Sequence, residues 1–121
     1  MTPDTSFWQA LMEIAVTNPI VLDRPKGTAH PRYPDMIYPL DYGYLENTIA
    51  GDGACIDIWI GSLNNKTLTG ILCTFDRLKR DAEIKLLIAC SSKDVEMIQN
   101  VNSEMQTLFI HNPLVEDDLP R

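Results

Sequence analysis

The stretch that decides the fold spans residues 56–90 and reads IDIWIGSLNNKTLTGILCTFDRLKRDAEIKLLIAC. It contains three segments that alternate in polarity or are rich in β-branched and apolar residues, which is typical of β-strands. The segments are 56–60, 67–75 and 84–90. Turn-forming residues separate them: Asn64 and Asn65 in the first gap, and the run from Asp76 to Asp81 in the second. Because no helix comes between these strands, we expect neighbouring strands to pair antiparallel.

Helical patterns flank the strands on both sides. Residues 6–16 carry apolar side chains at the spacing of a one-sided helix, with Trp8 as the expected core or interface anchor. Residues 92–109 return to a helical period, and the spacing of Ser91 and Asp94 predicts a capping box at the start of that helix. The order helix, strands, helix predicts a mainly β fold with flanking helices, as a small antiparallel barrel or a curled sheet. Residues 1–121 fit a single domain.

A long stretch between the N-terminal helix and residue 56 looks irregular. Residues 19–22 form a short strand candidate, but residues 23–44 contain four prolines. Proline lacks a backbone donor and fixes φ, which excludes central strands and helix interiors. The same stretch holds all four tyrosines of the chain, which favour an ordered conformation. Long loops in compact domains are usually functional or disordered, so we interpret residues 23–44 as an ordered functional loop.

Charge and composition limit the partners and the compartment. The formal net charge of −7 argues against nucleic-acid binding, which depends on many lysine and arginine contacts to phosphate. No apolar stretch approaches the ~20 residues needed to cross a membrane, and no basic signal-peptide start is present. Cys55, Cys73 and Cys90 are too widely spaced for a zinc site and suit a reducing compartment. We therefore expect a cytoplasmic protein with no membrane or nucleic-acid partner.

Two pairs of aspartates indicate metal chemistry. Asp52 and Asp57 are five residues apart at one end of an expected strand, and Asp76 and Asp81 repeat this spacing in a turn. Carboxylate oxygens are ligands that Mg²⁺ prefers, together with water and substrate phosphates. Asp57 is the most informative, because an unpaired carboxylate inside an apolar strand is costly. The alternatives are solvated turn aspartates, and a strand that presents Asp57 and Trp59 to solvent.

Three motifs in a fixed order add a resemblance to a known family. The run Tyr38-Pro-Leu-Asp-Tyr-Gly-Tyr44, then Asp52-Gly-x-x-x-Asp57, then Asp76-x-x-x-x-Asp81 resembles the family I soluble inorganic pyrophosphatases. Those enzymes have Y-P-x-x-Y-G-Y, D-G-D-P-x-D and D-x-x-x-x-D-x-K in the same order. The resemblance implies an OB-like closed β-barrel with an N-terminal and a C-terminal helix. It also implies hydrolysis of inorganic pyrophosphate, or a related small phosphoanhydride, by a water that Mg²⁺ or Mn²⁺ activates.

The resemblance assigns roles by position. It implies Asp57 and Tyr42 as catalytic residues, with Tyr42 near the attacking water. It implies a metal set of Asp23, Asp52, Asp57, Asp76 and Asp81. Tyr42 is also the substrate contact that matches by position. The family's lysine and arginine have no clean match between Lys26 and Tyr38, so Lys26, Arg32 and His30 are the candidates for phosphate contact, with Lys85 as a further substrate candidate. His30 is also a candidate general base.

Two departures from the family pattern lead to a rival interpretation. Ala54 stands where the family has the aspartate that orients the attacking water, and Glu83 stands where it has a substrate lysine. Lys85 lies two residues further on and is expected on the same face of its strand as Glu83. Turnover should therefore be slow. The alternative is a non-catalytic relative that binds a metal-phosphate ligand or a protein partner. The sequence leaves a homo-oligomer open.

Overall fold

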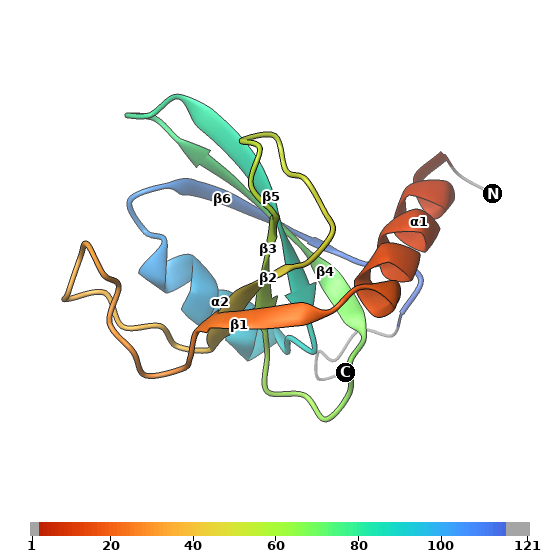
Figure 1. Ribbon diagram of the computed structural model, residues 1–121, viewed down its shortest axis with the longest axis horizontal. Coiled ribbons are helices and arrows are strands. Elements are labelled where there is room, and N and C mark those ends of the chain that lie inside the picture. Colours follow the sequence, from red (N-terminus) through yellow and green to blue (C-terminus); the bar gives the residue numbers. More distant parts are fainter. Residues whose placement is uncertain (1–2, 116–121) are drawn as a thin grey trace.

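The computed structural model describes residues 3–115, which form a mainly β structure with two flanking helices (Figure 1). The elements are α1 (Pro3–Thr17), β1 (Ile20–Arg24), β2 (Asp41–Leu45), β3 (Ile56–Ile60), β4 (Leu68–Asp76), β5 (Asp81–Ile88), α2 (Ser92–Val101) and β6 (Gln106–His111). This confirms the expected order of a helix followed by strands, and the three strands expected between residues 56 and 90. Neither α1 nor α2 has the length and apolar character that a membrane crossing needs.

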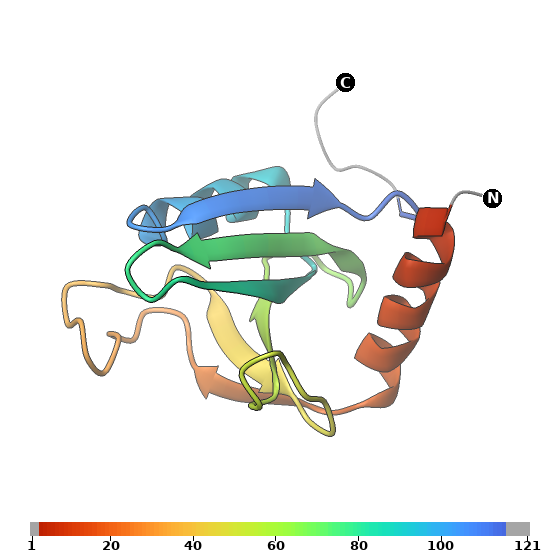
Figure 2. The same cartoon turned by 90° about the horizontal axis from the view of Figure 1, so that it is seen from above.

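One mixed sheet contains all six described strands, in the order β1-β2-β3-β5-β4-β6. Neighbours are antiparallel except β3 and β5, which run parallel, so the expectation of purely antiparallel pairing is wrong at this point. Figure 2 shows the sheet curled, with β4, β5 and β6 in one layer, β1 and β2 in the other, and β3 between them. The expected curled sheet is confirmed. Closure into a barrel is not seen among the described strands, because β1 and β6 end the series.

Each face of the sheet packs against one helix. On one face, Trp8 of α1 is 4% exposed and packs in a cluster with Ile58 and Leu86, as expected of a core anchor. On the other face, Trp59 is 1% exposed and packs with Ile98 of α2. The alternative in which β3 presents Trp59 to solvent is therefore wrong, whereas the side chain of Asp57 on the same strand is 35% exposed.

The C-terminal part differs from the sequence expectation. The capping box at Ser91 and Asp94 is confirmed, but α2 ends at Val101 instead of continuing to residue 109. The amide of Asn102 still donates to Ile98, and a turn then leads into β6. Met105, Leu108 and Phe109 fitted a helical period by coincidence, because a strand with apolar residues on both faces can satisfy that spacing over a short window. His111 is the last residue of β6.

The proline-rich stretch contains more regular structure than expected. Its last residues form β2, which pairs with both β1 and β3. Gly43 is required there, because a Cβ at this position would collide with the carbonyl oxygen of Val21. The remaining loop is ordered, as expected: the amide of Gly27 donates to the carbonyl of Tyr38, and the amide of Tyr38 donates to the carbonyl of Thr28. This loop lies along one side of the candidate site.

Candidate functional site

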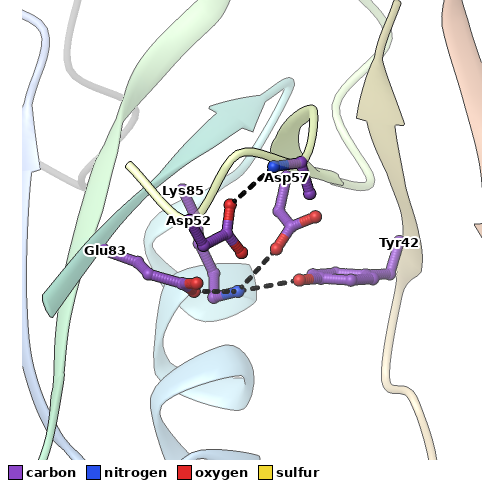
Figure 3. A network of polar contacts seen from close by, with 6 residues as sticks. Tyr42, Asp52, Asp57, Glu83 and Lys85 are labelled. Atoms are coloured by element: carbon purple, nitrogen blue, oxygen red, sulfur yellow. Dashed lines mark hydrogen bonds and ion pairs between the residues drawn. The ribbon is translucent and has the colours of Figure 1, made fainter. Parts of the chain in front are cut away.

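Lys85 is the centre of the polar network drawn in Figure 3. Its Nζ atom donates to Tyr42 Oη at 2.7 Å and to Asp57 Oδ2 at 3.1 Å, and it lies 3.4 Å from Glu83 Oε2. Lys85 is 8% exposed, so its charge is largely removed from bulk water. A buried ammonium needs compensating partners, and the two carboxylates and the phenol supply them.

The strand register explains why these four residues meet. The parallel pairing of β3 with β5 sets Ile58 opposite Leu86, so the preceding residues, Asp57 and Lys85, are also neighbours. Glu83 and Lys85 alternate with Ile84 along β5 and therefore share one face, as the sequence predicted. These contacts bring together residues from three strands that are far apart in the sequence.

The phenol of Tyr42 stays protonated across the ordinary pH range. Burial raises the pKa of Tyr42 far above its usual value, and the neighbouring charge of Asp57 and a side-chain hydrogen bond with Asp57 raise it further. Because Lys85 donates to the phenol oxygen, the phenol proton is directed to another acceptor. Tyr42 is thus built as a neutral hydrogen-bond donor within the site.

A cleft of about 570 Å³ opens beside this network. It is lined by residues of the proline-rich loop and the adjoining strands: Asp23, Arg24, His30, Pro31, Arg32, Tyr38, Tyr42 and Asp57. Four of the predicted site residues, Asp23, Arg32, Tyr42 and Asp57, therefore share one cleft. Both acidic and basic side chains line it, an arrangement that suits a ligand combining negative oxygens with a cation.

Arg24 and Tyr38 are site residues that sequence reasoning missed. The register between β1 and β2 shifts between Leu22 and Arg24, and such a bulge interrupts strand alternation. Asp23 and Arg24 can therefore both line the cleft, with Arg24 Nη1 3.3 Å from Asp23 Oδ1. Burial raises the pKa of Tyr38, and the positive charge of Arg24 partly opposes that effect. No sequence signal marks a bulge, but an arginine beside a predicted metal aspartate could have been considered.

His30 has a structural role in the loop. Its Nδ1 atom accepts from the backbone amides of Arg32 and Tyr33, at 3.0 and 3.2 Å, and its ring stacks on Tyr38. Nδ1 is therefore occupied, and a ligand in the cleft could reach only Nε2. The predicted contact of His30 with phosphate stays a prediction, restricted to that atom.

The predicted metal aspartates are divided between two places. Asp57 and Asp23 line the cleft, whereas Asp52 is not among its lining residues. The Oδ1 atom of Asp52 accepts from the amide of Ala54 at 3.0 Å (Figure 3). Asp76 and Asp81 face each other across the β4–β5 hairpin, and neither is among the cleft residues. The Asp76 carboxylate accepts the amides of the turn residues Leu78 and Lys79, so it stabilises the hairpin.

The remaining substrate candidates separate in the same way. Lys85 lies in the network, whereas Lys26 is exposed and is not among the cleft residues. The backbone amide of Lys26 donates to Asp41 Oδ1 at 2.8 Å, which fixes the start of the loop. Within residues 3–115, no three side chains of His, Cys, Asp or Glu lie together in a way that could hold a metal ion.

Comparisons with known proteins give no assignment. No protein-family model matches the sequence, and no curated protein matches it with a significant score. Function must therefore be argued from the cleft and its polar network.

Proposed function

We propose that this chain hydrolyses inorganic pyrophosphate, or a related small phosphoanhydride, in the cleft between the proline-rich loop and β3. The observation that carries the proposal is the cleft itself, where Asp23 and Asp57 lie among Arg24 and Arg32, next to the Lys85 network. Arginine side chains suit bidentate contact with phosphate oxygens, and carboxylates suit divalent cations. The order of the family motifs supports the same activity.

The donor chemistry of the cleft fits Mg²⁺, or Mn²⁺ in its place, when the cation binds together with phosphate. Mg²⁺ keeps several waters and commonly uses one or two protein carboxylates plus substrate phosphates. Asp57 and Asp23, which both line the cleft, would hold it. When bound, the cation would polarise phosphoryl oxygens and lower the pKa of a water molecule.

The protein's own side chains would position the substrate. Arg24 and Arg32 would bind phosphate oxygens from the loop side of the cleft. Tyr42, kept neutral by its environment, would donate a hydrogen bond and would not carry a negative charge near the anionic substrate. Lys85 would hold Asp57 in a fixed orientation and limit the repulsion between the carboxylates and the phosphates.

A second candidate function is binding of a metal-phosphate ligand without efficient turnover. Ala54 favours it, because the family's water-orienting aspartate is missing at that position. The location of Asp76 and Asp81 at the β4–β5 hairpin favours it as well, because neither lines the cleft and the Asp76 carboxylate accepts from turn amides.

The relation to the OB-like closed barrel is part of the same proposal. The sheet curls so that β1 and β2 lie across from β4 and β6 (Figure 2). We infer that this curled sheet corresponds to such a barrel with one gap in its pairing, between β1 and β6.

A phosphate-release assay tests the proposed activity. Pyrophosphate and nucleoside triphosphates are each incubated with the protein, with and without Mg²⁺. We expect phosphate release from pyrophosphate that depends on the cation and is lost in Asp57→Asn. Asp35→Asn removes an exposed carboxylate from the neighbouring loop and serves as the matched control, with activity retained. No release from any substrate, combined with Mg²⁺-dependent binding of a non-hydrolysable diphosphonate, would favour the binding function.

A further inference from the structure

The two edges of the sheet differ in how well they are protected. β1 carries Asp23 and Arg24, contains a bulge and is followed by Pro25. Charged side chains, bulges and prolines are devices that prevent a strand edge from pairing with another chain. β6 itself contains no charged residue, bulge or proline, and Pro113 follows only two residues after its end. It reads QTLFIH and pairs with β4 without a register shift along its whole length.

β6 and the part of β4 that pairs with it carry no charged residues. Asp, Glu, Lys and Arg make up 22% of the chain, yet none occurs in residues 106–111 or in residues 68–75 of the neighbouring strand β4. With a net charge of −7, most surfaces of two copies repel each other when they approach. The β6 edge offers a second copy a contact without opposed like charges.

The outer strand also exposes large apolar side chains. Leu108 is 59% exposed and Ile110 is 39% exposed. Both lie on the α1 side of the sheet, because β6 pairs them with Cys73 and Ile71 of β4. The opposite face of β6 is already in use, since Phe109 packs against the cluster that α2 covers. Apolar exposure therefore coincides with the unprotected backbone edge.

We propose that β6 is a dimerisation strand whose occupant is the β6 strand of a second copy of this chain. Antiparallel pairing of two identical strands about a two-fold axis is self-complementary, and the outward N–H and C=O groups of each strand satisfy those of the other. With the axis perpendicular to the sheet, side chains on one face meet side chains of the same face. Leu108 of one copy then lies against Ile110 or Leu108 of the other. The two sheets join into one continuous sheet.

The extent of this contact sets the expected strength. A stable interface buries about 800 Å² from each partner. A contact made by one six-residue strand and its neighbouring side chains is small compared with this area. The dimer should therefore dissociate on dilution. The candidate cleft lies beside β1 and β3, at the other end of the strand order, and stays open in this arrangement.

Sedimentation velocity over a dilution series tests the proposal. We expect the full chain to sediment as a dimer at high concentration and as a monomer on dilution. Ile110→Lys, which would place like charges across the two-fold axis, should remain monomeric at every concentration. Leu22→Lys introduces the same charge at the β1 edge and should dimerise like the parent. Circular dichroism and melting curves establish that both variants are folded.

A second measurement needs no variant. Amide hydrogen exchange of the parent chain should become slower with concentration at those β6 amides that do not bond to β4. Three results would overturn the proposal: a monomer at all concentrations, a dimer that Ile110→Lys leaves intact, or protection that does not change with concentration.

Discussion

Lys85 of β5 places its ammonium 3.1 Å from the carboxylate of Asp57, across the parallel junction between β3 and β5. This ion pair gives the candidate site a cation of its own. The negative charge of Asp57 and Glu83 is therefore already partly balanced before any metal binds. A site with a built-in counter-ion should bind free metal weakly and bind it better when phosphate arrives with it.

Lys85→Met tests this balance. Removing the ammonium leaves Asp57 and Glu83 facing each other without a partner, which should lower the free energy of unfolding by about 1–3 kcal/mol. Mg²⁺ should then raise the melting temperature of the variant by more than it raises that of the parent. Lys66→Met, an exposed loop lysine, is the control and should behave like the parent. Equal metal responses in all three proteins would contradict a counter-ion role for Lys85.

Tyr42→Phe should change the dependence of stability on pH. The folded protein raises the pKa of Tyr42 above its ordinary value of 10.0, through burial first and Asp57 second. The folded state therefore keeps a proton that the unfolded state loses, and stability must fall as the pH rises above about 10. We expect denaturant titrations to show a shallower alkaline loss for Tyr42→Phe than for the parent. At neutral pH the variant should be about 1 kcal/mol less stable, because it lacks the hydrogen bond to Lys85.

Tyr33→Phe is the matched control for this measurement. Tyr33 is 58% exposed in the same loop region, so its removal should leave the alkaline slope unchanged. Parallel slopes for the parent and Tyr42→Phe would show that Tyr42 titrates alike in the folded and unfolded states.

Arg24→Met should weaken substrate binding. The side chain lines the cleft and is held by Asp23, so its loss removes a charged contact to phosphate. A hydrogen bond to a charged group contributes about 1.5–3 kcal/mol, which predicts a KM for pyrophosphate about ten-fold higher or more. Arg77→Met changes an exposed residue of the β4–β5 turn and should leave KM unchanged. An unaltered KM in Arg24→Met would place phosphate elsewhere in the cleft.

The central strands and the first helix could be predicted because their patterns are local. The alternation in residues 56–60 and the apolar run before Cys90 can each be recognised within one segment, without knowledge of its strand partners. β2 was missed because prolines surround it, although Pro39 lies just outside the strand and Gly43 serves a close strand contact. The helix-to-strand change after Val101 was missed because its apolar spacing fits both periods.

The site was only partly predictable, for a related reason. Asp57, Tyr42 and Lys85 were each selected from the sequence, and the register of three strands brings them together. Arg24 depends on a bulge, which is a property of the pairing between β1 and β2. Asp76 was assigned to metal by position, but its oxygens serve the hairpin turn. Sequence spacing cannot distinguish these uses of an aspartate, because both place it next to a strand end.

Ala54→Asp tests whether a missing base limits turnover. Ala54 is exposed and follows Gly53, whose φ of 86° forms a tight turn closed by the bond from Ala54 N to Asp52 Oδ1. Because Ala54 is exposed, the fold should tolerate an aspartate there, and surface changes usually alter stability by less than about 0.5 kcal/mol. A positioned base contributes roughly 10²–10⁴-fold, so kcat on pyrophosphate should rise, up to that limit.

Ala54→Asn is the matched control, because asparagine has the shape of aspartate but its amide cannot act as a general base. The kcat of this variant should stay at the parent value. Glu83→Lys, which the family pattern suggests as a second restoration, should instead lower activity. It would replace a carboxylate partner of Lys85 with a second ammonium on the same strand face. Combining it with Ala54→Asp should therefore lose part of the gain. If Ala54→Asp and Ala54→Asn had equal kcat values, the attacking water would have to be activated elsewhere in the cleft, with Nε2 of His30 the first position to test.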